Sequence, residues 1–147
     1  MVRSVIAVIV SYIVMFVLTF IAFVCAYLVV GAEVAFKPAS YEASTTWIGI
    51  AFAINVIIAI IGGVICAVIA KGGRAPLALA VLVLVLGLLF ALPARSKREA
   101  NLTATRAGNV SSTEAAQKAY WPVWVPFTFP LTGAIGVLIG GRLKKRS

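Results

Sequence analysis

The fold of this chain is decided by residues 43–94, which read ASTTWIGIAFAINVIIAIIGGVICAVIAKGGRAPLALAVLVLVLGLLFALPA. Two uncharged runs, 43–70 and 75–94, flank the short segment 71–74, KGGR. Each run reaches the length of about 20 residues that an α-helix needs to cross the hydrocarbon layer of a membrane. Pro76 suits the first turn of a helix, where its missing N–H would be unpaired anyway. The stretch therefore predicts two antiparallel transmembrane helices joined by a tight turn.

The rest of the chain contains two further uncharged runs of similar length. Residues 4–32 and 119–141 also lack charged side chains, and the first of these runs is too long for the apolar region of a signal peptide. Charged residues make up 12% of the sequence, against about 25% in a soluble domain. The sequence thus predicts an all-α fold in a single domain with both termini on the same side of the membrane. We expect a four-transmembrane-helix bundle with helices at about 5–30, 47–70, 75–92 and 121–141.

One sizeable loop remains in this prediction, residues 93–120. Pro93 is expected to end the third helix, because proline lacks the N–H that the helix ladder needs. The segment Ser111-Ser112-Thr113-Glu114 matches a capping box, in which serine and glutamate bind the first free N–H groups of a helix. We therefore expect a short helix at about 112–120 within an otherwise irregular loop.

Lysine and arginine residues are divided almost equally between the two sides of the predicted bundle. We expect the termini in the cytoplasm, because Arg3 and the basic tail lie directly at helix ends and the first helix usually sets the topology. The cluster Arg95, Lys97 and Arg98 favours the opposite orientation. Aromatic residues expected at the lipid headgroups of the other side are Trp47, Tyr120, Trp121 and Trp124. Tail residues expected to contact lipid headgroups, or simply to anchor the last helix, are Arg142, Lys144, Lys145 and Arg146.

Small and weakly polar residues predict which helices pack, because they let helix backbones approach closely in lipid. They recur at helical spacing in the first, second and fourth spans, whereas Gly87 is the only glycine of the third. We therefore expect the first, second and fourth helices to form the core and the third to lie at the periphery. The predicted packing residues are Ser11, Thr19, Ala22, Asn55, Gly62, Gly63, Gly133, Gly136 and Gly140.

Two features within the spans are polar or irregular. Asn55 lies deep in the second span, where an unpaired amide is unfavourable. Thr19 is its expected partner; a pore or substrate contact is the alternative. In the fourth span Pro122, Pro126 and Pro130 each remove one backbone hydrogen bond, which predicts a bent helix or, alternatively, a half-inserted segment at 121–129.

The sequence offers little for catalysis. It has no histidine and no aspartate, and its four glutamates lie outside the apolar runs. Cys25 and Cys66 are expected near opposite faces of the membrane, too far apart for a disulfide. Proton-coupled carriers need ionisable groups within the bilayer, which the predicted spans lack. We therefore predict no catalytic residue, no cofactor and no metal site, and no nucleic-acid or small-molecule substrate is identifiable.

Two stretches carry a resemblance to known proteins. RAPLALAVLVLVLG at 74–87 and GAIGVLIGGR at 133–142 look like the small four-helix inner-membrane proteins found in many bacterial genomes. This resemblance implies a location in the bacterial inner membrane and transfers no functional residue.

These observations lead to two functional hypotheses. The first is a non-catalytic accessory, structural or assembly subunit that packs against other membrane subunits or against a second copy of itself. The second is a small oligomeric channel or passive transporter with a path near Asn55 and the fourth helix. Membrane lipids are expected partners in both.

Overall fold

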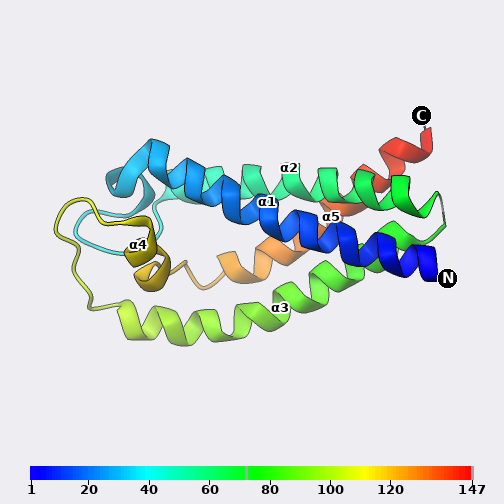
Figure 1. The fold of residues 1–147 in the computed structure, drawn as a ribbon. Helices are drawn as coiled ribbons and strands as arrows, with labels where there is room; N and C mark the ends of the chain where they lie inside the picture. Colours follow the sequence, from blue (N-terminus) through cyan, green and yellow to red (C-terminus); the bar gives the residue numbers. More distant parts are fainter. Residues whose placement is uncertain (72, 147) are drawn as a thin grey trace.

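The computed structural model describes residues 1–71 and 73–146, the last two without their side chains. Gly72, in the predicted turn, lies outside the described residues. Within the described part the regular elements are helices, and four of them are long and apolar enough to cross a membrane (Figure 1). The helices are α1 (Val2–Ala35), α2 (Thr45–Ala70), α3 (Ala75–Asn101), the short α4 (Ser112–Lys118) and α5 (Val125–Arg146). The prediction of an all-α integral membrane protein with four spanning helices is confirmed.

Both termini lie at one end of the bundle, together with the turn between α2 and α3 (Figure 1). We call this the terminal end. At the opposite end, the loop end, α4 and the segments 32–44 and 102–124 form a small cap over the helices.

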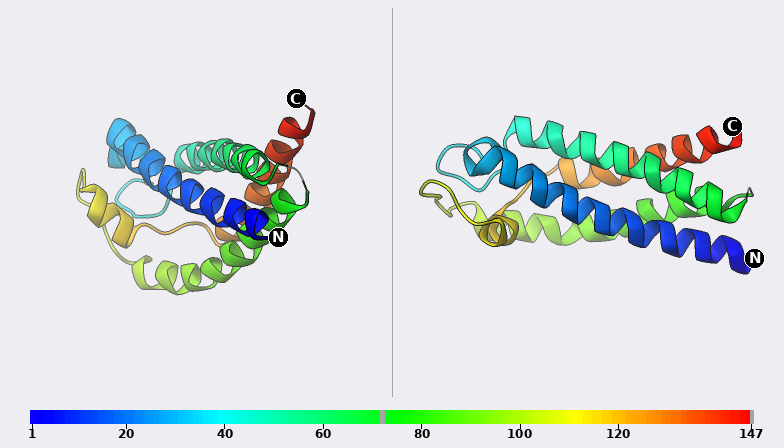
Figure 2. Two further views of the ribbon diagram at one scale, coloured as in Figure 1. Left: turned by 45° about the vertical axis from the view of Figure 1, so that its right-hand side comes forward. Right: turned by 45° about the horizontal axis from the view of Figure 1, so that its top comes forward.

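The four long helices form an open arc rather than a closed bundle (Figure 2). α2 and α5 make the most extensive pair, α1 packs against α2, and α3 packs against α5. α1 and α3, at the two ends of the arc, approach each other only toward the terminal end (Figures 1 and 2).

The expectation that the first helix lies in the core and the third alone at the periphery is therefore wrong in part, because both helices lie at an end of the arc. The most apolar window of α3 is 22% buried, whereas that of α1 is only 6% buried. The contact between α3 and α5 uses a proline in place of paired glycines. A Cβ atom added to Gly87 would lie 2.6 Å from Cγ of Pro130, so the glycine makes room for the proline ring.

Close backbone contacts hold the terminal half of the bundle. A Cβ atom at Gly63 would lie 2.1 Å from the carbonyl oxygen of Val137, and one at Gly140 would lie 2.0 Å from that of Ile60. No other residue type permits this approach of α2 to α5. Around these contacts the buried cluster of the terminal half consists of Ala7, Met15, Ile58, Ala59, Cys66, Ala75, Leu79, Ala80 and Val137.

A second buried cluster fills the cap. Trp47 packs edge-to-face against Phe23 and Tyr27, at centroid distances of 5.8 and 6.3 Å. Trp47 and Tyr120 are buried, whereas Trp124 is 56% exposed. Two of the four aromatic residues expected at the headgroups therefore stabilise the cap instead, because the loop folds back over them.

Arg106 ties the cap together. Its side chain is 1% exposed and pairs with Glu33 at 2.8 Å. The guanidinium also donates to the backbone carbonyls of Gly108 and Ser40, at 2.6 and 3.2 Å. A planar group with five donors suits such a site, so that one side chain joins the end of α1 to the loop after α3.

Two predicted helices end well beyond their expected last residues. α3 continues through Pro93 to Asn101, because the proline removes a single backbone hydrogen bond and strong helix formers such as Ala94, Arg95 and Lys97 follow it. α1 extends to Ala35 after a kink at Gly31, whose φ of 73° requires glycine.

The fourth predicted span begins later than 121. α5 starts at Val125, with Pro126 in its first turn and Pro130 inside the helix, and residues 121–124 are not helical. Pro126 is thus at a position where proline is tolerated. The predicted N-terminal capping residue of the short helix α4 is confirmed, since Ser111 Oγ accepts a hydrogen bond from the Glu114 N–H at 3.2 Å.

Candidate functional site

The open side of the arc contains a cleft between α1 and α3. Its larger part is a cavity of about 390 Å³ at the level of the membrane spans, which we call the deep cavity. Above it, under the cap, lies a second cavity of about 230 Å³, the cap cavity. Trp121 lines both. We call the two together the lateral cleft.

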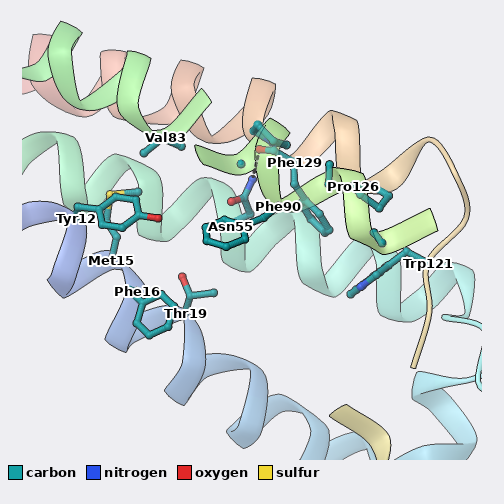
Figure 3. Close-up of a pocket in the computed structure, with 14 residues that line it drawn as sticks. Tyr12, Met15, Phe16, Thr19, Asn55, Val83, Phe90, Trp121, Pro126 and Phe129 are labelled. Carbon is teal, nitrogen blue, oxygen red and sulfur yellow. Dashed lines mark hydrogen bonds between the residues drawn. The ribbon is translucent and has the colours of Figure 1, made fainter. Parts of the chain in front are cut away.

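Side chains from all four long helices and from Trp121 line the deep cavity. α1 contributes Tyr12, Met15, Phe16 and Thr19 to one side, and α3 and α5 contribute Val83, Phe90, Pro126 and Phe129 to the other (Figure 3). Asn55 of α2 lies at the back. Phe16 and Phe90 are more than half exposed at the surface of the helices. In a membrane that surface faces lipid, so the lateral cleft opens to lipid chains rather than to water.

Asn55 does not pair with Thr19 as predicted. Its Nδ2 donates to the backbone oxygen of Phe129 at 3.1 Å and to Oγ1 of Thr132 at 2.9 Å, both on α5 (Figure 3). The reason is the helix order: α5 is the close neighbour of α2 at this depth, whereas α1 has moved away. Thr19 lies across the deep cavity instead.

The innermost part of the deep cavity is polar. Tyr12, Thr19 and Asn55 all line it, and the amide oxygen of Asn55 faces the cavity (Figure 3). Toward the cap the lining becomes aromatic. Trp121 packs edge-to-face against Phe129 at a centroid distance of 5.4 Å, and Phe129 contacts Phe52 at 4.6 Å. A bound molecule would meet an apolar corridor with a polar inner end.

The extension of α3 past Pro93 supplies a basic rim to the cleft. Lys97 lines the cap cavity, and its Nζ donates to the backbone oxygen of Ala116 on α4 at 2.7 Å. Arg95 and Arg98 line a small recess on the other side of Trp121. Positive side chains in the last turn also interact favourably with the helix dipole of α3.

Most of the predicted packing residues lie at contacts between helices. Gly62 lies against Met15, and Gly136 lies against Ala59, with Gly63 and Gly140 at the contacts described above. Gly133 lies between Val83 and Asn55. Ser11 is fully buried, close to the Cys66 thiol. Ala22 packs against the buried cluster of the terminal half, whereas Thr19 lines the wall of the deep cavity.

The basic tail lies at the terminal end. Arg142 and Lys144 are exposed there, and Lys144 helps to line a cavity of about 480 Å³ with Lys71. The side chains of Lys145 and Arg146 lie outside the described residues. Nearby, Arg3 Nε donates to the carbonyl of Ile69 at 2.6 Å, which binds one of the free carbonyl groups at the end of α2.

The described part of the chain contains neither a cluster of metal-binding side chains nor a pair of adjacent cysteines. No group of three or more His, Cys, Asp or Glu residues gathers there. Cys25 is exposed on α1, Cys66 is buried, and both are unbridged.

Comparisons with protein-family models, with curated proteins and with solved structures gave no match. The class of protein is therefore defined by the fold itself: an integral membrane protein with four spanning helices, a structured cap and a lateral cleft.

The cleft is not apparent from the amino-acid sequence. Phe90, Trp121 and Lys97 belong to it, but the sequence pointed to Trp121 only as a headgroup aromatic and to Lys97 only as part of a basic cluster. The available signal was indirect: the first span carries Phe16, Phe20 and Phe23, and the third span carries Phe90. Which of these rings share a cavity depends on the helix order.

Proposed function

We propose that the protein is a non-catalytic accessory component of the membrane that binds the apolar chain of an amphiphile in its lateral cleft. The supporting observation is the deep cavity of about 390 Å³, lined by Phe16, Phe90 and Phe129 and facing lipid. Cavities that bind small molecules commonly have volumes of about 300–1,000 Å³ and mostly apolar walls.

The length of the cleft suits a lipid chain. Along α1 its lining extends from Tyr12 to Tyr27, which is ~22 Å at 1.5 Å per residue. One leaflet contributes about 15 Å of hydrocarbon. A chain from the neighbouring leaflet would therefore fit beside α1 without leaving the membrane.

The glycines that pack helices together indicate which surfaces remain for a partner subunit. Gly62, Gly63, Gly136 and Gly140 are used within the chain, and the exposed faces of the spans carry mainly valine, isoleucine, leucine and phenylalanine. Bulky faces of this kind suit lipid. An interaction with a second subunit or copy therefore has its best remaining surface at the cap, where polar and aromatic side chains are held in place.

A channel or passive transporter is the second candidate, favoured by the polar inner end of the deep cavity near Asn55. Beyond Asn55 the close contacts at Gly63 and Gly140 bring the backbones of α2 and α5 together. A path through the membrane would need a second copy of the chain. Flux of small solutes into liposomes at the rate of protein-free vesicles would argue against this candidate.

We further propose that the membrane is a bacterial inner membrane and that the termini are cytoplasmic. The basis is the resemblance stated above and the basic residues at the terminal end, among them Arg3, Arg142 and Lys144.

Native mass spectrometry of the protein released from mild detergent tests chain binding. We expect the wild type to retain one lipid-sized adduct. Thr19→Phe places a ring in the deep cavity and should remove the adduct. Val17→Phe adds the same ring to the half-exposed, lipid-facing side of α1 and should keep it. Equal retention by both variants, or no adduct on the wild type, would refute the proposal.

A further inference from the structure

We propose that the rim of the lateral cleft binds the phosphate headgroup of an anionic lipid through Lys97 and Arg98. This inference rests on the proposed function, because the lipid chain would occupy the cleft below. It adds the class of headgroup that the site selects.

Lys97 faces the position that a headgroup would take. Its side chain lines the cap cavity together with Ser112 and Ala116 of α4. An ammonium group has three donors. The bond to Ala116 uses one of them, which leaves two for a ligand at the top of the cleft.

Arg98 lies on the other side of Trp121, the residue shared by the deep cavity, the cap cavity and the small recess beside Arg98. Its Nε is buried and lacks a hydrogen-bond partner among the described residues. A buried N–H of a charged group without an acceptor is unfavourable. The recess beside Trp121 has a volume of about 10 Å³, enough for one water molecule, which can accept from Nε and donate to a phosphate oxygen at the rim.

The nearby carboxylates are engaged elsewhere. Glu99 pairs with Arg95 at 3.6 Å. Glu114 on α4 accepts from Tyr41 and from Lys118. Within the described part of the chain, Lys97 and Arg98 are therefore two cations without a carboxylate partner, directly above an opening of lipid-chain length. This charge favours an anionic lipid over a zwitterionic one, whose positive group the rim would repel.

The expected preference follows from the charge. Two basic residues near a membrane surface favour anionic lipid by about 1 kcal/mol each, and 1.4 kcal/mol corresponds to a tenfold change in affinity. We therefore expect about a 30-fold preference at low ionic strength, decreasing as salt is added.

The test is competition between phosphatidylglycerol and phosphatidylcholine with the same acyl chains, added in equal amounts to the purified protein and counted by native mass spectrometry. The wild type should retain mainly phosphatidylglycerol. The double variant Lys97→Gln/Arg98→Gln should still retain one lipid but without preference. Lys71→Gln/Arg74→Gln removes the same charge at the other end of the molecule and should keep the wild-type preference. Circular dichroism identifies any variant that has unfolded.

The outcomes separate the two proposals. One lipid bound without preference by the wild type, or an unchanged preference in the Lys97/Arg98 variant, overturns the headgroup site while chain binding stands. No retained lipid on the wild type overturns the proposed function itself. Displacement of phosphatidylglycerol by millimolar inorganic phosphate would indicate a site for the free ion and overturn the lipid assignment.

Discussion

Asn55 places an amide within α2 at membrane depth, and its two N–H groups are both used by α5. Phe129 and Thr132 accept these bonds at 3.1 and 2.9 Å. Its presence in the span indicates a hydrogen bond between helices, as the sequence analysis expected, but the amide bridges to a different helix. Spacing within one helix places a residue on a face, whereas the partner depends on which helix lies against that face.

Replacing Asn55 tests this bridge. Asn55→Leu should lower the thermal midpoint in detergent, by the equivalent of about 1 kcal/mol for two interhelical hydrogen bonds in a membrane protein. The matched variant Thr132→Val removes one of the two acceptors. If the bridge exists, the double variant should lose less than the sum of the single losses. Strictly additive losses would contradict it.

At the scale of elements, helix contacts in this chain are of two kinds. In the terminal half, glycines bring α2 and α5 together until backbone touches backbone. In the loop half, the helices separate and the cap holds them through side chains such as Arg106 and Tyr41. The first kind is visible in the sequence as regular glycine spacing. The second depends on loop residues far apart in the sequence.

Gly140→Ala tests the first kind of contact. The added Cβ would lie 2.0 Å from the carbonyl oxygen of Ile60, so α2 and α5 must separate. We expect a loss of about 1 to 3 kcal/mol, typical of overpacking, seen as a lower thermal midpoint. Gly49→Ala is the control, because a Cβ atom added at Gly49 would meet no atom within 4 Å and alanine favours a helix. This variant should not lower the stability of the protein. Equal effects of the two variants would contradict the proposed packing.

The docking of α4 onto the rest of the cap should depend on pH. Hydrogen bonds from Tyr41 and Lys118 stabilise the charged form of Glu114 and lower the pKa of its carboxyl group. Because the folded pKa is lowered, this stabilisation is complete above the ordinary pKa of a glutamate and is lost as the pH falls through the lowered value. We expect the near-ultraviolet circular dichroism of the cap to weaken between about pH 5 and about pH 3.

Two variants separate this effect from general acid sensitivity. Glu114→Gln should already show the weakened signal at neutral pH and change less with acid. Glu99→Gln removes an exposed carboxylate that pairs with Arg95 and should behave like the wild type. An acid transition that persists unchanged in Glu114→Gln would assign it to other groups.

At the scale of the whole molecule, the arc of helices produces the lateral cleft. Glycine contacts close the arc between α2 and α5, Gly87 and Pro130 attach α3 to α5, and the cap spans the loop end. Nothing in the spacing of any one helix requires α1 and α3 to diverge. The divergence follows from the order of neighbours and from α4, which contacts α1 and receives Lys97 from α3.

The orientation in the membrane can be measured on cysteine variants made in a Cys25→Ala background. If the termini are cytoplasmic, an impermeant thiol reagent added outside intact cells should label Thr103→Cys in the cap and leave Ser4→Cys unlabelled. The positions lie at opposite ends of the molecule, so each controls for the other. The reverse pattern would invert the orientation, and it would place the basic rim at the cytoplasmic leaflet.

The sequence by itself determined the number of spanning helices, their approximate positions, the capped short helix and the glycine faces. These features are local: uncharged length decides whether a segment can cross a membrane, and residue spacing decides which side chains share a helix face. The tertiary structure alone decided the partner of Asn55, the burial of Trp47 and Arg106, the continuation of α3 past Pro93, and the cleft. Each of these depends on which segments become neighbours, and in a chain whose spans are almost equally apolar, hydrophobicity cannot choose among neighbours. Close packing and a few hydrogen bonds make that choice.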